Sequence, residues 1–192
     1  MSQCSDTVKR LSLELGGNAP FVVFEDADVD QAVDAAMASK FRNAGQTCVC
    51  ADRFLVHESV HEVFVRKLVS KIKDIKVGPG ISSDTNMGPL ISEPAAKKVA
   101  EKVKQAIDEG AHCEVGGTLL PELGGQFYSP TVLTNVSRDS AVWKTENFSP
   151  VVPIMQYSTE EEALELANDS PVGLASYFCT KDLSRAFRFS KR

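Results

Sequence analysis

Two short runs contain residue types that could perform covalent chemistry. The run FRNAGQTC, Phe41 to Cys48, places a thiol where a helix gives way to a loop, and the run LELGG, Leu13 to Gly17, places the carboxylate of Glu14 before two glycines. A free thiol with a pKa of about 8.5 is only a few per cent thiolate at pH 7. A nucleophilic Cys48 therefore needs a base or electropositive surroundings, and Glu14 is the candidate base.

Each run alone also has an ordinary structural explanation. Most free cysteines are buried structural residues, so Cys48 taken singly is better explained that way. Glu14 taken singly is a solvated strand residue, and Gly16 and Gly17 could simply turn the chain. The functional interpretation depends on the two runs occurring together, about thirty residues apart.

Together the two runs resemble the paired active-site signature of the aldehyde dehydrogenase superfamily. Further along, TENFSP at Thr145 to Pro150 is similar to the family's EExFGP segment, while GPLI at 88–91 and ANDSPVGLA at 167–175 match its framework pattern. The fuller run ASKFRNAGQTCVC, 38–50, looks most like the succinic semialdehyde dehydrogenase branch. The resemblance covers the chain nearly from end to end and implies an aldehyde dehydrogenase catalytic domain.

The resemblance implies NAD(P)-dependent oxidation of an aldehyde. Attack by the Cys48 thiolate gives a thiohemiacetal, whose carbon releases hydride to the nicotinamide of NAD or NADP and leaves a thioester. Glu14 would activate the water that hydrolyses the thioester and would assist deprotonation of Cys48. The backbone N–H of Cys48 would supply one donor of the oxyanion hole.

The segment that resembles EExFGP implies a cofactor-binding role for Glu146 and its neighbour Phe148. In the family this glutamate holds the ribose hydroxyls of the nicotinamide. The chain departs from the pattern at Thr145, usually glutamate, and at Ser149, usually glycine. If the fold needs a left-handed conformation at Ser149, a serine is strained there. The ordinary alternative for Glu146 is an exposed loop acid.

Arg42 and Cys50 flank the thiol on either side. Arg42 lies six residues before Cys48, where semialdehyde dehydrogenases place an arginine that receives the substrate's distal carboxylate. A guanidinium suits a carboxylate because it donates two parallel hydrogen bonds. The alternative is a surface charge at a helix end.

The resemblance also suggests that Cys48 and Cys50 form a reversible regulatory disulfide, although a bridge at this spacing strains the loop. The alternative for Cys50 is a spectator thiol.

Other residues that could bind a ligand are given no role. His57 and His61 are expected to straddle a strand-to-helix junction without a third ligand, so no metal site is expected. Trp143, Phe127 and Tyr128 are expected to pack in or around the core.

Composition restricts the class of ligand. The chain has 192 residues, 43% of them hydrophobic, which is enough for one substantial core. The net charge is −5 without a basic block, so a small-molecule substrate is expected rather than nucleic acid. No apolar run is long enough for a bilayer span or a secretory signal. Five cysteines, an odd number, favour a reducing compartment, cytoplasmic or mitochondrial.

Short apolar runs alternate with helical periodicities, which predicts an α/β three-layer sandwich: a mostly parallel sheet with helices on both faces. Capping boxes are expected at Asp28 with Gln31 and at Thr159 with Glu162. Strands are expected at 22–24, 53–56, 131–133, 151–156 and 175–178. Helices are expected over about 28–41, around 64–72, over 92–110, after Thr159 and over 184–192.

The resemblance covers only part of an aldehyde dehydrogenase. Residues 1–192 are expected to form an incomplete catalytic domain, without the N-terminal coenzyme-binding domain and the C-terminal oligomerisation segment. The chain is expected to end in mid-helix, which agrees with an incomplete domain. Members of the family form homo-oligomers through the C-terminal segment. The competing hypotheses are a catalytically incompetent fragment that acts as a structural or interaction module, and a thiol-dependent esterase. The sequence does not distinguish NAD from NADP, or succinic from glutaric semialdehyde.

Overall fold

A computed structural model describes all 192 residues and contains one six-stranded sheet with the order β3-β4-β5-β2-β1-β6. Every neighbouring pair is parallel except β3 with β4. The expected mostly parallel α/β fold is confirmed. The strands are β1 (Ala19–Val23), β2 (Ala51–His57), β3 (His112–Val115), β4 (Thr131–Thr134), β5 (Val151–Tyr157) and β6 (Tyr177–Cys179).

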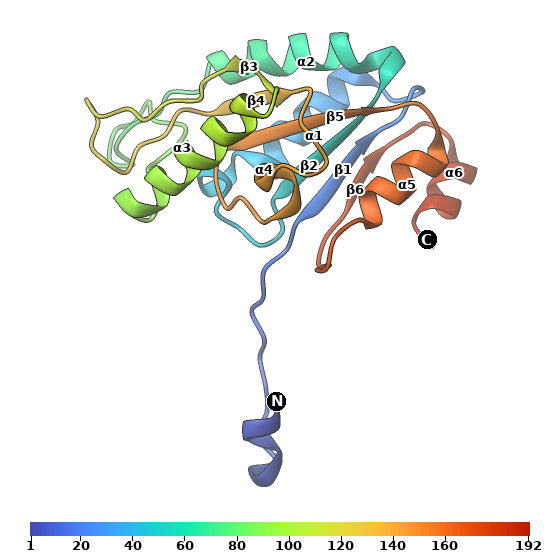
Figure 1. Cartoon of the computed structure of the whole chain (residues 1–192), viewed down its shortest axis with the longest axis horizontal. Coiled ribbons are helices and arrows are strands. Elements are labelled where there is room, and N and C mark those ends of the chain that lie inside the picture. The colour runs from blue at the N-terminus through green and yellow to red at the C-terminus, as the bar shows by residue number, and fades with distance from the viewer.

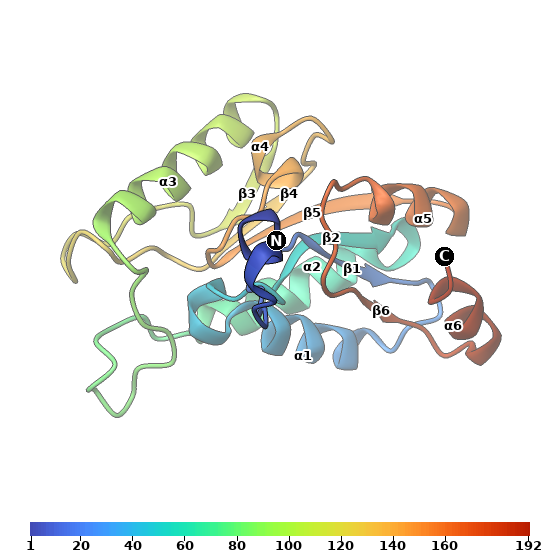
Figure 2. The same cartoon turned by 90° about the horizontal axis from the view of Figure 1, so that it is seen from below.

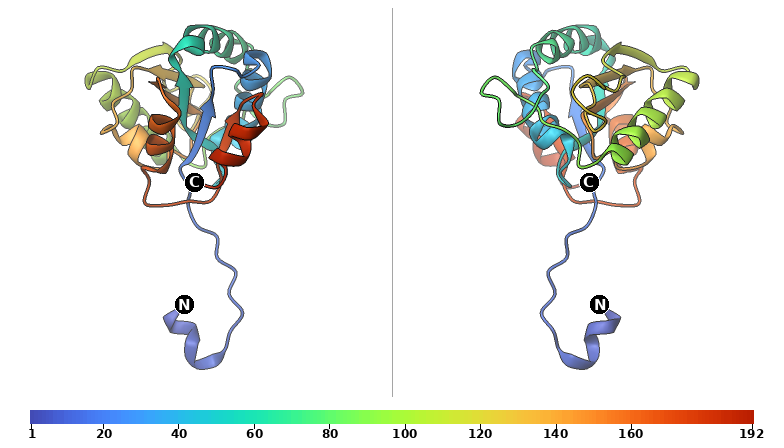
Figure 3. Two further views of the ribbon diagram at one scale, coloured as in Figure 1. Left: turned by 90° about the vertical axis from the view of Figure 1, so that its right-hand side faces the viewer. Right: turned by 90° about the vertical axis from the view of Figure 1, so that its left-hand side faces the viewer.

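Helices cover both faces of the sheet. They are α1 (Val29–Lys40), α2 (Glu58–Lys73), α3 (Glu93–Asp108), α4 (Ala141–Lys144), α5 (Glu160–Asn168) and α6 (Leu183–Phe189), with 3-10 turns η1 (Ser2–Thr7) and η2 (Arg42–Gly45). The α1 crossover from β1 to β2 and the α5 crossover from β5 to β6 run in opposite directions. Because such crossovers are right-handed, the two helices lie on opposite faces. Figure 3 shows α1 and α2 on one side and α3, α4 and α5 on the other.

The central strands are almost completely buried because both faces are covered. Phe21, Phe54, Leu55 and Ile154 each expose no more than 1% of their surface. Such strands read as continuous apolar runs rather than as alternating ones, which is why the sequence indicates them, although β1 begins three residues before the expected strand and ends at Val23. None of the helices has both the length and the apolar character needed to cross a bilayer.

Local side-chain chemistry sets the helix boundaries. The Asp28 carboxylate accepts hydrogen bonds from the N–H groups of Asp30 and Gln31 and so caps α1. The Thr159 hydroxyl accepts from the N–H of Glu162 at the start of α5. At the end of α3, Gly110 adopts a φ of 107°, a conformation that ends a helix and that glycine adopts without strain. The boundaries predicted at these three positions are confirmed.

One strand and one α-helix have no counterpart in the sequence prediction. Strand β3 is an edge strand whose first three residues are exposed, so its sequence HCEV carries no apolar run. Helix α4 has only four residues, too few to show a helical period. In addition, residues 1–15, here called the N-terminal arm, leave the body of the molecule, as Figure 1 shows.

Candidate active site

The predicted motifs meet at one edge of the sheet. Gly17 comes just before β1, Cys48 just before β2, and Glu146 shortly before β5. These strands lie side by side and run parallel, so their amino-terminal ends meet at the same edge. Figure 2 views the molecule from below, the side toward which the arm projects. The fold thus gathers segments that are up to 129 residues apart.

The loop before Cys48 has an unusual backbone. Asn43, Ala44 and Gly45 have φ angles of 52°, 54° and 76° in succession, all left-handed. A non-glycine residue pays roughly 1 kcal/mol or more for this conformation. At Gly45 space decides as well, because a Cβ there would lie 2.1 Å from the carbonyl oxygen of Ser149. The loop is therefore pressed against the segment that carries Glu146.

Gln46 fixes the other side of the same loop. Its Oε1 accepts the N–H of Ile91 at 2.8 Å, while its Nε2 donates to the carbonyls of Asn43 at 3.0 Å and Pro89 at 3.3 Å. The side chain joins the FRNAGQTC run to the GPLI segment. This gives the framework segment a physical role, which is to support the thiol-bearing loop.

The two glycines of LELGG lie in close contact with the other two segments: Gly17 faces backbone, whereas Gly16 faces the end of the Glu146 side chain. A Cβ at Gly17 would lie 2.4 Å from the carbonyl oxygen of Cys48, and a Cβ at Gly16 would lie 2.7 Å from Oε2 of Glu146. The Gly17 N–H donates to Oε1 of Glu146 at 3.0 Å. Neither glycine has a left-handed φ, so close approach explains them better than a turn does.

The two cysteines of the loop have different surroundings. Cys48 is half-buried, and neither its sulfur nor its backbone N–H is hydrogen-bonded within the chain. Cys50 is buried; its sulfur accepts a hydrogen bond from the Thr47 hydroxyl at 2.9 Å and lies 3.7 Å from the carbonyl oxygen of Lys40. All five cysteines are free thiols. Cys48 thus has both a thiol and an N–H available to a ligand.

Arg42 lies beside this loop, at the start of η2. It is exposed, and its guanidinium forms no hydrogen bond or ion pair within the chain. It lines a groove of about 610 Å³ between α1 and β6, together with Thr47 and Val49 on either side of Cys48. Tyr177 also lines the groove, and its hydroxyl donates to the Val49 carbonyl at 2.6 Å. Arg42 therefore has unused donors in a groove next to the thiol-bearing loop.

Glu14 is the predicted site residue that is not brought to the others. It lies on the N-terminal arm, is exposed, and forms no hydrogen bond or ion pair. Its neighbours Leu11, Leu13 and Leu15 are also exposed, although large apolar side chains usually pack. The arm in this position leaves the candidate base away from the candidate nucleophile.

The backbone around Glu146 differs from the expectation in one respect. The left-handed residue of TENFSP is Phe148, with a φ of 48°, and not Ser149. Ser149 is buried without a left-handed φ, so the strain considered for a serine at this position does not arise. Phe148 is 44% exposed at the rim of the loop.

A buried ion pair supports the loop and was missed from the sequence. Lys40 Nζ lies 2.7 Å from Asp52 Oδ1, with the two side chains 0% and 4% exposed. The other Asp52 oxygen accepts the N–H of Asn147 at 2.9 Å. The only sequence signal was the position of Lys40 on the apolar side of a helix and of Asp52 within a buried strand.

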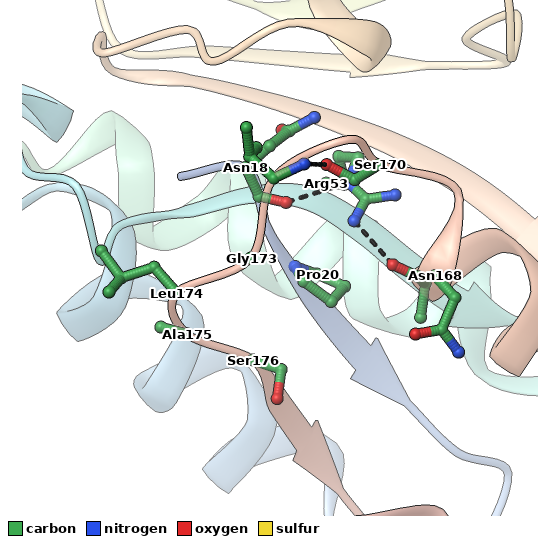
Figure 4. A pocket seen from close by; sticks show the side chains of 11 residues that line it. Asn18, Pro20, Arg53, Asn168, Ser170, Gly173, Leu174, Ala175 and Ser176 are labelled. Carbon is green, nitrogen blue, oxygen red and sulfur yellow. Dashed lines mark hydrogen bonds between the residues drawn. The ribbon is translucent and has the colours of Figure 1, made fainter. Parts of the chain in front are cut away.

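Arg53 was also missed, and it lines the cavity of about 260 Å³ shown in Figure 4. Its guanidinium donates to the carbonyls of Asn18 at 3.0 Å, Leu166 at 2.8 Å and Ala167 at 2.7 Å. Burial lowers its pKa, and the carboxylates of Asp52 and Asp169 oppose that shift. The carbonyl of Asp169 accepts a further bond at 3.3 Å, so four of the five N–H donors of Arg53 are used within the chain. Arg53 thus fixes the chain just after Gly17 against the end of α5.

His57 and His61 lie where the sequence placed them. His57 ends β2 and accepts the N–H of Ser59, so it caps α2, while His61 lies within that helix. No group of three or more histidine, cysteine or acidic side chains is placed to hold a metal ion. Trp143, Phe127 and Tyr128 are buried, as expected for packing residues.

Comparison with known proteins agrees with this geometry: the chain belongs to the aldehyde dehydrogenase family, whose pattern it matches over residues 1–192. It is 47% identical to 3-sulfolactaldehyde dehydrogenase from Pseudomonas putida over 100% of its own length and 39% of the relative's. It is also 47% identical to the NADP(+) succinate-semialdehyde dehydrogenase GabD of Escherichia coli, covering 98% of the chain and 39% of that relative.

A solved structure of succinate-semialdehyde dehydrogenase from Burkholderia pseudomallei is 48% identical and superposes with a TM-score of 0.95, covering 99% of this chain and 39% of that one. The chain therefore spans about two-fifths of the length of the relatives it matches.

Proposed function

We propose that this chain is the nucleophile-bearing part of an NAD(P)-dependent aldehyde dehydrogenase that oxidises succinic semialdehyde or a close relative to the carboxylic acid. The observation that carries the proposal is the position of Cys48 on a loop held between Gly17 and Ser149, with the Glu146 carboxylate bonded to the adjacent Gly17. In this proposal, residues 1–192 form an incomplete catalytic domain, and the coenzyme-binding domain and oligomerisation segment are additional.

The proposed reaction takes place on the sulfur of Cys48. The thiolate attacks the aldehyde carbon to form a C–S bond, and the resulting oxyanion accepts the unpaired N–H of Cys48. The thiohemiacetal carbon then loses hydride, two electrons and one proton in total, and becomes a thioester. Glu14 removes a proton from water and hydroxide adds to the thioester carbon. The C–S bond then breaks to release the acid, and Glu14 returns its proton to the departing thiolate of Cys48.

The nicotinamide nucleotide, when bound, supplies the hydride acceptor. The residues present fit such a group. Glu146 is half-buried with one carboxylate oxygen bonded to Gly17, and its Oε2 has no hydrogen-bond partner. A carboxylate with an unused acceptor suits ribose hydroxyls. Phe148, exposed beside it, provides an apolar surface.

Arg42 is the proposed receptor for the substrate's distal carboxylate. Its donors are unused, and the groove that it lines reaches both neighbours of Cys48. A guanidinium binds a carboxylate through two parallel hydrogen bonds. Succinic, glutaric and sulfonated three-carbon aldehydes all place an anion some bonds away from the aldehyde. Arg42 is therefore an argument for an aldehyde with a distal anionic group, and a weaker argument for any particular length of its carbon chain.

The first test is alkylation of the five cysteines with iodoacetamide at graded pH, with each site followed by peptide mass spectrometry. Cys48 is expected to react fastest near neutral pH. Burial raises the pKa of Cys179 to about 11 and also raises that of Cys113, so these two thiols are internal slow controls, while Cys4 near the N-terminus tests simple accessibility. A Cys48 that reacts no faster than Cys4 would favour the structural-module hypothesis over a nucleophile.

A Glu14→Gln variant separates the two proposed roles of the carboxylate. Because the arm holds Glu14 away from Cys48, the alkylation rate of Cys48 in this chain is expected to be unchanged. In an enzyme with the remaining domains, the same variant is expected to accumulate the acyl-enzyme, since thioester hydrolysis lacks its base. A slower alkylation of Cys48 in the isolated variant would contradict the arm position described here.

Cys50 is proposed as a redox partner of Cys48. Peroxide would take two electrons from the two thiols, forming the S–S bond, and would leave as water. Since the Cys50 sulfur is now directed toward Thr47 and Lys40, the bridge requires the loop to rearrange. Mild peroxide is expected to remove both thiols together and a reductant to restore both. Oxidation of Cys48 alone, to sulfenic acid or beyond, would count against the pair.

A further inference from the structure

Lys102 reaches from α3 to the loop that carries Glu146. Its Nζ donates to the Thr145 hydroxyl at 2.8 Å and to the backbone carbonyl of Glu146 at 3.0 Å. The side chain is half-buried, so the ammonium group is partly shielded from water. Hydrogen bonds from a charged donor in such a position are stronger than neutral ones.

Asp52 holds the other end of the same peptide group. Its Oδ2 accepts the N–H of Asn147 at 2.9 Å, while its Oδ1 is neutralised by Lys40. The carbonyl of Glu146 and the N–H of Asn147 belong to one peptide unit. A cation therefore faces the negative end of that peptide dipole and an anion faces its positive end, which is the favourable arrangement at both ends.

Fixing this peptide unit also restricts the direction of the Glu146 side chain. The peptide plane sets the backbone torsions on either side of it, and these set the Cα–Cβ direction. The carboxylate then lies where Oε1 takes the Gly17 N–H and Oε2 approaches Gly16. A rotated peptide would carry the carboxylate away from these glycines.

We propose that Lys102 is a positioning residue: with Asp52 it clamps the Glu146–Asn147 peptide and so directs the carboxylate that holds the nicotinamide ribose. The clamp follows from the contacts of this chain alone. Its consequence for the nucleotide rests on the proposed function of Glu146, and the experiment treats the two separately.

The clamp is tested by amide hydrogen exchange at Asn147, measured by NMR in the full 192-residue chain. In Lys102→Met, exchange at Asn147 is expected to rise about tenfold, because its peptide loses one of two charged partners. Lys102→Arg should restore most of the protection. Lys104→Met is the matched control: Lys104 lies on the same helix and pairs with exposed Asp108, so exchange at Asn147 should not change. Equal exchange in Lys102→Met and wild type would overturn the clamp.

A pH series distinguishes a charged clamp from simple packing. Burial is the main factor that lowers the pKa of Lys102; the cations of Lys98 and Lys40 add to this, while Asp52 and Glu146 oppose it. Wild type should therefore lose protection at Asn147 in the alkaline range, after correction for intrinsic exchange, whereas Lys102→Arg keeps its charge and its protection. Identical alkaline profiles in wild type and Lys102→Arg would show that the charge has no role.

The consequence for the nucleotide is tested with nicotinamide mononucleotide, titrated while the amide signals of Glu146 and Phe148 are followed. Lys102→Met and Glu146→Gln should each weaken binding about tenfold, or roughly 1.4 kcal/mol. Weakening by Glu146→Gln but not by Lys102→Met would refute the positioning role. If wild type itself gives no shift, the ribose-binding role of Glu146 fails, while the exchange measurement still decides the clamp.

Discussion

At the scale of single residues, the site is defined by glycines at which another segment approaches closely. Gly16, Gly17 and Gly45 each bring a backbone within contact of a functional segment, and a Cβ at any of them would lie within 2.7 Å of another atom. The active-site glycines of both motifs thus share one cause. They let the thiol-bearing loop, the segment before β1 and the Glu146 loop approach one another.

Gly45→Ala is expected to destabilise the chain by about 2 kcal/mol or more, because alanine is strained at a φ of 76° and its Cβ would strike the Ser149 carbonyl. Urea unfolding measures this loss. Gly80→Ala is the matched control, since nothing lies within 4 Å of a Cβ there, and it should change stability by less than about 0.5 kcal/mol. Equal effects of the two substitutions on the free energy of unfolding would show that the loop moves to accommodate the added Cβ at little cost.

At the scale of elements, the ion pair between Lys40 and Asp52 joins the end of α1 to the start of β2. Lys40→Met should cost about 3–5 kcal/mol, since it leaves a buried carboxylate without its partner. The double variant Lys40→Met/Asp52→Asn should cost less than the sum of the single variants by more than about 1 kcal/mol.

A surface pair provides the comparison. Lys67 and Asp30 form an ion pair between α2 and α1 with side chains that are 38% and 73% exposed. Lys67→Met should therefore cost less than about 1 kcal/mol. Both variants lose one lysine, so a similar loss in each would mean that burial does not set the strength of the Lys40 pair.

Asp26 fixes the start of α6, because its carboxylate binds Thr180 and Asp182 just before the helix and Arg185 within it. The stability that this carboxylate contributes should depend on pH. Burial alone would raise the pKa of Asp26, but hydrogen bonds from Thr180, Lys181 and Asp182 and the charge of Arg185 outweigh it, so the pKa is lowered from 3.8. A lowered carboxyl pKa contributes stability that is complete above the unfolded-state pKa and is lost as pH falls through the folded-state value.

Asp26→Asn should therefore reduce the free energy of unfolding by a constant amount at neutral pH, about 1–3 kcal/mol, and the difference from wild type should shrink below about pH 4. Denaturant unfolding from pH 7 to pH 2 measures it. Asp6→Asn, on the exposed arm, is the control and should parallel wild type throughout. A difference that grows on acidification would have the wrong sign for this mechanism.

The sequence predicts the elements that bury apolar side chains and misses those that do not. The central strands β1, β2 and β5 and the helices α1 to α3 follow from apolar periodicity and caps. The exposed edge strand β3 and the short α4 give no such signal. The location of the site could also be predicted from the sequence, because the LELGG, FRNAGQTC and TENFSP runs each come just before an expected strand. The Lys40–Asp52 pair and the Lys102 clamp could not be predicted from the sequence, since they join segments whose distance from each other is set only by the fold.

At the scale of the whole molecule, one face of the chain has the character of an interface. The N-terminal arm carries exposed Leu11, Leu13 and Leu15, and Phe148 and Leu174 are exposed at the same edge of the sheet as Cys48. Large apolar side chains gathered near a site usually mark a contact surface. We therefore expect the rest of an aldehyde dehydrogenase to cover this edge and to bring the arm, with Glu14, toward the thiol.

A graft tests this expectation together with the substrate class. Residues 1–192 would replace the matching segment of the E. coli succinate-semialdehyde dehydrogenase, to which the chain is 47% identical. The graft should oxidise succinic semialdehyde, and Cys48→Ser should abolish the activity.

In the graft, Arg42→Met should raise KM for succinic semialdehyde by at least about tenfold, since one charge-assisted hydrogen bond is worth roughly 1.5–3 kcal/mol. The same substitution should leave KM for butanal nearly unchanged, because butanal has no distal carboxylate. A parallel rise for both aldehydes would show that Arg42 supports the loop rather than the substrate, and an inactive but folded graft would contradict the proposed role of this chain in catalysis.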